Sequence, residues 1–290
     1  MYLKSGISLE SSYKDILRGI LENEIKRETR DTSSLELSPF VWTTTYPLRN
    51  VLTNKVRNIN HAYAIIEFLW IMSGRTDIEM LAPYNSNIIQ FSRNKLSLTG
   101  AYGPKINQQL QYVVDTLKHD EGSRQAIVSI WERRPSLDQD IPCTLSLQFL
   151  RSMLGLDLIV TMRSNDVWLG FPYDVFSFTM IQSFVAHKLK LEVGRYTHQV
   201  ASEHLYLCNR DKAELIAKST DTMFGEIFET PKIISDDLEQ TMLIEQKLRR
   251  AYLSREKNKL DENLKEIELV PEPWNGWLKI IRNHLQKKLK

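Results

Sequence analysis

Residues 161–178 hold the densest group of side chains that could do chemistry, and they read TMRSNDVWLGFPYDVFSF. Around a Gly-Phe-Pro turn the segment places a cation, a hydroxyl, an amide and two carboxylates, namely Arg163, Ser164, Asn165, Asp166 and Asp174. A structural loop between two apolar segments rarely needs so many directed polar groups. We therefore interpret the segment as a binding site for an anionic, hydrogen-bonding heterocycle, in which Asp174 bears on which heterocycle fits.

Cys143 is a candidate nucleophile, because it follows a proline and precedes an apolar segment. A nucleophilic thiolate needs cations nearby. The sequence offers four arginines for that purpose, Arg124, Arg133, Arg134 and Arg163. The guanidinium groups of Arg124 and Arg163 also suit phosphate, although arginines more often form surface ion pairs. A free cysteine is more often a small buried hydrophobic residue, so both interpretations of Cys143 stay open.

Three further residues could take part in catalysis or binding. Glu67 lies in the apolar run IIEFLW, and a carboxylate buried there must be paired or have a raised pKa, as acid/base groups often do. Its alternative is an ordinary carboxylate of an amphipathic helix. His204 and Tyr206 alternate, so on a strand they face the same side. They could bind sugar hydroxyls or be core residues with satisfied polar tips.

The elements that must position these residues follow from the hydrophobic period. The spacing predicts helices over a segment that Ser8 can cap and over residues 61–73, 105–118 and 175–189. It predicts strands over residues 126–131, 145–150, 156–162 and 193–201, with β-formers mixed into 35–48. Residues 237–268 are charged with helical spacing. Without repeats or linkers, the chain is predicted to be one α+β domain over residues 1–290.

Composition bounds the class of protein. The chain has 290 residues, 42% of them hydrophobic, which suffices for a sizeable core. Its 38 Lys+Arg against 36 Asp+Glu give a formal charge of +2, so bulk charge argues for neither nucleic acid nor membrane as a partner. Two cysteines make no disulfide framework. No apolar run reaches the roughly 20 residues that span a bilayer, and the N-terminus lacks a signal-peptide pattern, so we expect a cytoplasmic protein.

In order and spacing, these residues resemble the thymidylate synthase superfamily over about residues 25–215. Four stretches carry the resemblance: His61–Trp70 with Gly74–Ile78 around Glu67; Ala101-Tyr102-Gly103; Ser123-Arg124-Gln125 with Pro142-Cys143; and Arg163–Asp166 through Leu169–Pro172, followed by His204-Leu-Tyr206. The resemblance implies a layered α+β fold in which helices pack on a mixed sheet. It also implies a homodimer. The charge and spacing of the sequence beyond these stretches predict a helical C-terminal extension over about residues 237–290.

The resemblance implies a reaction on a pyrimidine nucleoside monophosphate. Cys143 would add to C6, and C5 would take a one-carbon unit from 5,10-methylenetetrahydrofolate, with no metal and no nucleic acid required. A synthase then reduces the exocyclic methylene on C5 with hydride, whereas a hydroxymethylase adds water. Glu67 would organise the water and the proton transfers.

The resemblance also assigns the binding residues. The nucleotide would be bound by Arg163, Ser164, Asn165, Asp174, His204 and Tyr206, and by Arg124 of the partner subunit. The folate would be bound by Asp166, Gly170, Ile89 and Tyr102.

Asp174 departs from the synthase pattern, in which this position is asparagine. An amide can donate to O4 and accept from N3–H of uracil, whereas an ionised carboxylate only accepts. Cytosine offers its N4 amino group as a donor, so Asp174 favours cytosine. An unsatisfied buried polar group costs about 1–3 kcal/mol, enough for roughly ten- to a hundredfold discrimination. The alternative role for Asp174 is the N-cap of the helix predicted at 175–189.

Two further departures favour water over hydride. Ile89 stands where synthases carry a tryptophan that shields the methylene intermediate, and the sequence ends without the short apolar tail that closes the synthase site. The block Met162–Val167 with Gly170-Phe171 and Asp174, strengthened by Arg134-Pro-Ser136, is closer to the cytidylate and deoxycytidylate hydroxymethylases than to synthases.

We therefore predict 5-hydroxymethylation of a cytidine monophosphate, deoxy or ribo. One alternative is a thymidylate synthase or a deoxyuridylate hydroxymethylase that tolerates Asp174. Another is a nucleotide- or RNA-binding protein without catalysis, against which the joint presence of Cys143, Glu67, Arg163 and Asp166 argues. The choice between ribose and deoxyribose, the fate of the product and the role of residues 237–290 stay open; for these residues a solvated helix at the dimer edge is the default.

Overall fold

The computed structural model describes residues 2–23, 25–29, 32–132, 140–219 and 227–290. Arg133, Arg134 and Ser136, which the sequence analysis singled out, lie outside the described residues. The chain divides into two compact units, one of residues 1–59, 110–132 and 143–230 and one of residues 60–109, 133–142 and 231–290. Each unit combines segments that are distant in the sequence. The single domain over residues 1–290 stays a prediction.

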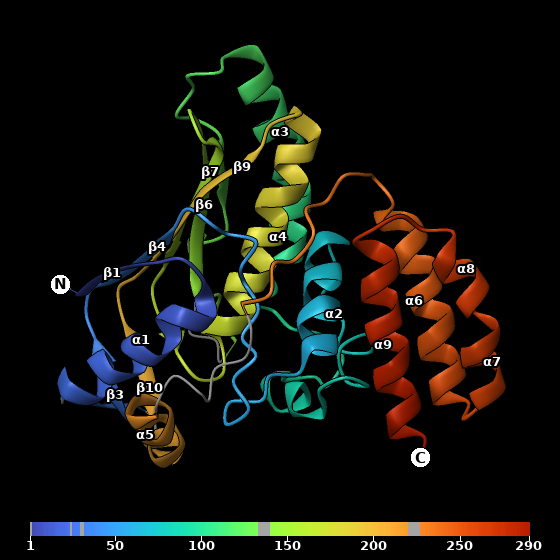
Figure 1. Ribbon diagram of the computed structural model, residues 1–290, viewed down its shortest axis with the longest axis horizontal. Helices are drawn as coiled ribbons and strands as arrows, with labels where there is room; N and C mark the ends of the chain where they lie inside the picture. Colours follow the sequence, from blue (N-terminus) through green and yellow to red (C-terminus); the bar gives the residue numbers. More distant parts are fainter. Residues whose placement is uncertain (1, 24, 30–31, 133–139, 220–226) are drawn as a thin grey trace. The chain divides into compact units, whose positions relative to one another are not determined.

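Two sheets form the framework of the first unit (Figure 1). In its described part, six strands follow the order β1 (Tyr2–Gly6), β4 (Phe40–Thr44), β9 (Val193–Val200), β7 (Gly155–Met162), β6 (Thr144–Ser152) and β5 (Ile127–Ser129). The second sheet follows the order β2 (Lys26–Thr29), β3 (Thr32–Leu37), β10 (Glu203–Tyr206) and β8 (Asn165–Asp166). Both sheets mix parallel and antiparallel pairs, which confirms the predicted mixed α+β architecture.

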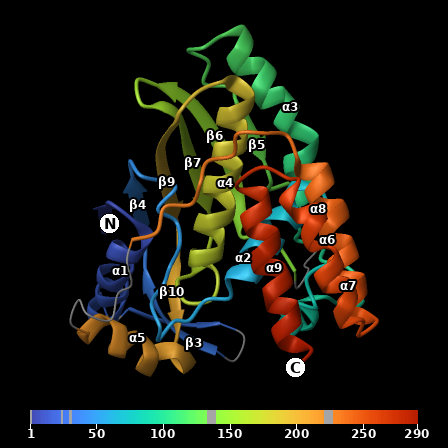
Figure 2. The same ribbon diagram turned by 45° about the vertical axis from the view of Figure 1, so that its right-hand side comes forward.

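The long helix α4 (Phe171–Leu189) packs on β7 and β9, as Figure 2 shows. Strand β7 alternates as predicted, with the even-numbered side chains from Leu156 to Met162 buried on one face. The helix begins at Phe171, four residues before its predicted start. Pro172 in the first turn suits a helix N-terminus, because the missing N–H has no partner to lose there, but it breaks the apolar period on which the prediction rested.

The predicted N-terminal helix is confirmed as α1 (Leu9–Asn23). Ser8 caps it, since its Oγ accepts from the Ser11 backbone N–H at 3.0 Å. Its buried face packs against β3 and against α5 (Arg210–Lys218). That face consists of Leu9, Tyr13, Ile16, Leu17 and Ile20, all fully buried.

The second unit is mainly helical. Its helices are α2 (His61–Met72), the 3-10 helix η1 (Ser86–Phe91), α6 (Leu238–Leu253), α7 (Lys257–Glu262), α8 (Leu264–Glu268) and α9 (Trp274–Lys288). Helix α3 (Gly103–His119) begins in this unit and continues in the first.

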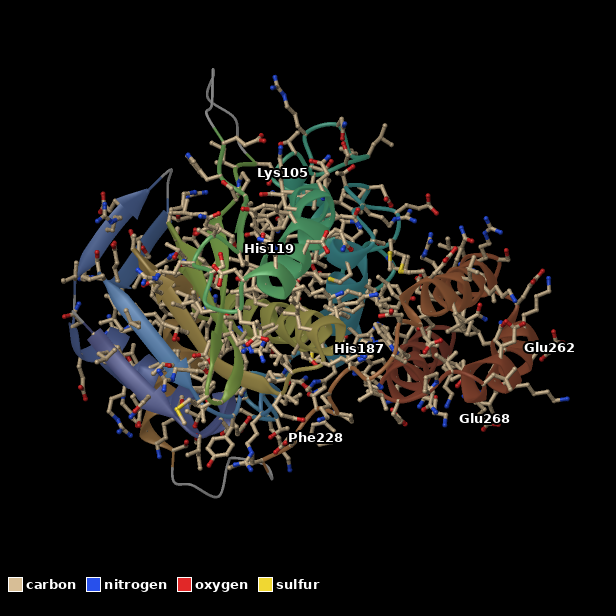
Figure 3. The ribbon with its side chains drawn as sticks, turned by 90° about the horizontal axis from the view of Figure 1, so that it is seen from above. Lys105, His119, His187, Phe228, Glu262 and Glu268 are labelled. Carbon is tan, nitrogen blue, oxygen red and sulfur yellow. The ribbon has the colours of Figure 1, made fainter. Side chains whose placement is uncertain are left out.

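The predicted helical extension is confirmed, but its default interpretation as a solvated helix is wrong. Helix α9 packs against α2, where Phe68 stacks on Trp274 with ring centroids 6.4 Å apart and meets Trp277 edge-on at 5.5 Å. The charges that suggested a solvated segment lie on the other side, as Figure 3 shows for Glu262 and Glu268, which are exposed. The apolar stripe of this segment therefore completes the core around α2.

Among the described residues, no helix is long and apolar enough to cross a membrane.

Candidate active site

The antiparallel pair of β6 and β7 brings Cys143 next to Arg163. Thr144 pairs with Met162, so Cys143, just before β6, faces Arg163, just after β7. The Arg163 backbone N–H donates to the Cys143 carbonyl at 2.9 Å, and Arg163 Nη2 lies 3.7 Å from Cys143 Sγ. The thiol is half-buried. A guanidinium at this distance stabilises the thiolate form, which is the nucleophilic one.

The short parallel pair of β8 and β10 gathers the next group of predicted residues. Register places His204 beside Asp166, and the rings of His204 and Tyr206 meet edge-on with centroids 4.9 Å apart, as the predicted alternation requires. Ser164 Oγ lies 3.5 Å from His204 Nδ1. One side of this small sheet thus collects a hydroxyl, an imidazole, a phenol and a carboxylate.

A chain of two hydrogen bonds, through His198 to Tyr196, holds the side chain of Asn165, and neither residue was predicted. The Asn165 side chain is buried, and Nδ2 donates to His198 Nε2 at 2.9 Å, while His198 Nδ1 lies 2.8 Å from the Tyr196 hydroxyl. Burial lowers the pKa of His198 to about 3, so the ring is neutral and its Nδ1–H donates to Tyr196. The alternation of β9 indicates that both residues are buried, but it does not indicate their connection to Asn165.

Asp174 and Asn165 converge on Gly170. A Cβ at Gly170 would lie 2.6 Å from Asn165 Oδ1 and 3.3 Å from Asp174 Oδ2, so a side chain there would displace the Asn165 amide. Gly170 itself occupies the N-cap position of α4, and Asp174 lies in the first turn, with its backbone N–H donating to the Gly170 carbonyl at 3.0 Å. The alternative of Asp174 as the N-cap is therefore wrong.

Asp166 shapes the loop between Asn165 and Gly170. Its Oδ1 accepts from the backbone N–H groups of Trp168 at 2.8 Å and Leu169 at 3.0 Å. Burial raises the pKa of Asp166, and the bond from Leu169, the charge of His204 and the bond from Trp168 oppose that shift. Its second oxygen, Oδ2, is buried and accepts no hydrogen bond from the described residues.

Glu67 belongs to the second unit, on α2. Asn60 caps the helix by accepting from the Tyr63 backbone N–H at 3.1 Å, and one turn later the Tyr63 hydroxyl donates to Glu67 Oε1 at 3.0 Å. Burial raises the pKa of Glu67 to about 7, and the bond from Tyr63 opposes that shift. The alternative of an ordinary carboxylate on an amphipathic helix is wrong, because every residue of α2 other than His61 and Glu67 is buried. Tyr63 was missed, although its i, i+4 spacing to Glu67 could have suggested it.

Three further predicted residues, Arg124, Ile89 and Tyr102, lie on other elements. Arg124 is exposed near β5, and its backbone carbonyl accepts from Gln148 Nε2 at 3.1 Å. Ile89 is 37% exposed on η1, and Tyr102 is half-buried just before α3. Their predicted roles in phosphate and folate binding stay predictions.

Glu67→Gln is expected to change how stability depends on pH. Because the folded-state pKa lies above the ordinary value of 4.5, ionising Glu67 destabilises the fold, and the free energy of unfolding falls as pH rises from about 4.5 to about 7. Glutamine removes this loss. The free energy of unfolding of the variant minus that of the parent should therefore be larger at pH 8 than at pH 4, by up to about 3 kcal/mol. Denaturant unfolding at both pH values measures it. The exposed Glu239→Gln serves as control, and an equal effect of Glu67→Gln at both pH values would contradict the account.

Comparison with known proteins identifies the family. The family model described as thymidylate synthase matches residues 11–268. The chain belongs to the thymidylate synthase family. A deoxyuridylate hydroxymethyltransferase of Bacillus phage SP01 is 30% identical over 281 residues, covering 89% of this chain and 72% of the relative. One of Pseudomonas phage M6 is 30% identical over 194 residues, covering 63% and 55%. A thymidylate synthase of Mycoplasma genitalium is 25% identical over 277 residues, covering 77% and 94%.

Membership in the thymidylate synthase family confirms the predicted superfamily and fold. It makes the chain a one-carbon transferase that modifies C5 of a pyrimidine nucleoside monophosphate. The family binds this nucleotide together with a folate and uses 5,10-methylenetetrahydrofolate. Within the described ranges, no group of three or more His, Cys, Asp or Glu side chains could hold a metal ion.

Proposed function

We propose that the protein 5-hydroxymethylates a cytidine monophosphate, dCMP or CMP, with 5,10-methylenetetrahydrofolate as one-carbon donor. The observation that carries the proposal is Asp174, which lies in the first turn of α4 beside Gly170 and Asn165. An ionised carboxylate there accepts a hydrogen bond from the N4 amino group of cytosine. Against uracil it would set acceptor against acceptor at O4, at a cost of about 1–3 kcal/mol.

Cys143 supplies the nucleophile of the proposed reaction. Its thiolate forms a bond to C6 of the base, and the electron pair of the C5–C6 double bond is displaced toward N3, which takes up a proton. Arg163, with Nη2 3.7 Å from Sγ, stabilises the charge on sulfur before the attack. Ser164, His204 and Tyr206 bind the sugar and phosphate from one side of the β8–β10 pair.

Glu67 carries the proton transfers. A group with a pKa of about 7 is present in both forms near neutral pH, so it can take a proton at one step and return it at another. The hydroxyl of Tyr63 keeps one carboxyl oxygen oriented, which leaves the other to hold the water that ends up on the C5 substituent.

Asp166 fits the folate. The pterin ring offers N–H donors, and Asp166 has one carboxyl oxygen, Oδ2, to which no described residue donates. Its other oxygen is engaged by the loop backbone, which fixes the direction in which Oδ2 points. Methylenetetrahydrofolate supplies the one-carbon unit that C5 receives.

Product analysis tests the proposal. Purified protein is incubated with methylenetetrahydrofolate and, separately, with dCMP, CMP and dUMP, and each product is identified by mass. We expect a hydroxymethyl group on cytidylate and tetrahydrofolate as the second product. A methylated base with formation of dihydrofolate would instead indicate a synthase.

A second candidate is 5-hydroxymethylation of dUMP, which is favoured by the names of two relatives, both deoxyuridylate hydroxymethyltransferases. Turnover of dUMP without turnover of either cytidylate would select it. A nucleotide- or RNA-binding protein without catalysis is disfavoured by the contact between Cys143 and Arg163. A homodimer in which the partner's Arg124 binds the phosphate belongs to the same proposal, and the exposure of Arg124 is compatible with it.

A further inference from the structure

Arg57 is a cation near the candidate site for which the proposed reaction has no role. It lies in the segment between β4 and α2, and its Nε donates to the Trp168 carbonyl at 2.6 Å. Its guanidinium carbon lies 5.3 Å from the ring centroid of Trp168 and 5.8 Å from that of Tyr173. A half-buried arginine with a charge-assisted hydrogen bond and two ring contacts has little freedom to move.

The loop from Asp166 to Gly170 is held from two sides. Asp166 Oδ1 accepts the N–H groups of Trp168 and Leu169, as described above. On the other side, the Tyr13 hydroxyl donates to the Val167 carbonyl at 3.1 Å, and Arg57 donates to the next carbonyl, that of Trp168. Arg57 therefore completes a clamp on a loop whose position decides where Asp166 Oδ2 points.

The charge of Arg57 also acts on Asp166. The groups that face this carboxyl are Arg57 and His204, which favour its ionised form, and Glu203 on β10, a fully buried carboxyl whose own pKa is raised by burial and by the charge of Asp166. Tyr13 on α1 also faces these groups: burial raises the pKa of its hydroxyl, the charge of Arg57 opposes that shift and the charge of Asp166 adds to it. Removal of Arg57 would thus leave Asp166 with one cation fewer to favour its ionised form.

We propose that Arg57 is a positioning residue for the folate: it fixes the 166–170 loop and keeps Asp166 an acceptor for the N–H groups of the pterin. The inference rests on the folate-binding role of Asp166 in the proposed function. It does not rest on the choice of base, because the folate is common to both candidate nucleotides.

Three variants test the role of Arg57. Arg57→Met removes the charge and the donor, and Arg57→Gln keeps a donor for the Trp168 carbonyl without the charge. Arg49→Met is the matched control, because Arg49 also lies over a tyrosine ring, 4.4 Å from the centroid of Tyr46, but forms its ion pair with Glu229 and does not act on Asp166. The measured quantities are kcat, KM for methylenetetrahydrofolate and KM for the nucleotide that the parent uses, each across pH.

We expect Arg57→Met to raise KM for the folate about tenfold or more, while KM for the nucleotide changes less than about threefold. The acid side of the pH profile of folate binding should move to higher pH in Arg57→Met and in Arg57→Gln, because the pKa of Asp166 rises when the cation is lost. Arg49→Met should leave both quantities unchanged. A purely structural role of Arg57 would not move the pH profile.

Two outcomes would overturn the inference. One is an Arg57→Met protein that weakens folate and nucleotide equally with an unchanged pH profile. The other is an unchanged profile in Arg57→Gln, which decides the matter if the methionine variant does not fold. Failure of the proposed base choice is recognised separately, since the parent would then turn over dUMP alone and the folate measurements would be made with dUMP.

Discussion

Asp174→Asn is expected to move the preferred substrate from a cytidine to a uridine monophosphate. An amide beside Gly170 can donate to O4 and accept from N3–H of uracil. With cytosine bound in the same way, the amide NH2 would face the N4 amino group, donor against donor. Each mismatch costs about 1–3 kcal/mol, so the ratio of kcat/KM for dCMP to that for dUMP should fall by about 10² to 10⁴. Steady-state kinetics with both nucleotides measures the ratio.

Asp211→Asn is the matched control for this experiment. Asp211 is also an acidic residue in the first turn of a helix, α5, but it is exposed and belongs to no part of the candidate site. Its substitution tests the general effect of removing a negative charge at a helix N-terminus. A ratio that changes as little in Asp174→Asn as in Asp211→Asn would contradict the role of Asp174 in base choice.

Cys143→Ser is expected to reduce turnover by at least about 10⁴-fold, because serine cannot supply the thiolate nucleophile. Arg163→Met should keep the nucleophile but slow its reaction with iodoacetamide about tenfold or more, since the cation 3.7 Å from Sγ is lost. Turnover assays and the rate of alkylation, followed by mass, measure the two effects.

The second cysteine provides the control. Cys208 is exposed after β10, so Cys208→Ser should retain the turnover of the parent, and alkylation at Cys208 can be separated from alkylation at Cys143 by peptide mass. Substantial turnover by Cys143→Ser would contradict covalent catalysis at this residue. An unchanged alkylation rate in Arg163→Met would contradict activation of the thiol by Arg163.

The elements could largely be predicted because their signals are local. The periods of α1, α2 and β7 are carried by neighbouring apolar residues, and Ser8 marks its helix start by side-chain chemistry alone. The start of α4 was missed because Phe171-Pro-Tyr-Asp174 interrupts the apolar period that marks the rest of the helix. The many charges of the C-terminal segment suggested a solvated helix, so the buried tryptophan face of α9 was not predicted.

The residues of the candidate site could be predicted from the sequence, whereas the residues that hold them in place could not. The contact of Cys143 with Arg163 follows from pairing β6 with β7 in register, which two predicted neighbouring strands suggest. The residues that hold the site residues in place come from distant parts of the sequence. His198 reaches Asn165 from β9, and Arg57 reaches Trp168 across 111 positions, so neither contact has a local signal in one sequence. Long-range register, which depends on the whole sheet, decides such contacts.

Release of tritium from C5 tests the central claim most directly. Two reactions contain the protein, methylenetetrahydrofolate and equal amounts of dCMP and dUMP. In the first reaction dCMP carries tritium at C5, and in the second dUMP carries it. The tritium that appears in water is counted in each. The account predicts that release from dCMP exceeds release from dUMP by at least about tenfold and disappears in Cys143→Ser. Release from dUMP with none from dCMP would contradict it.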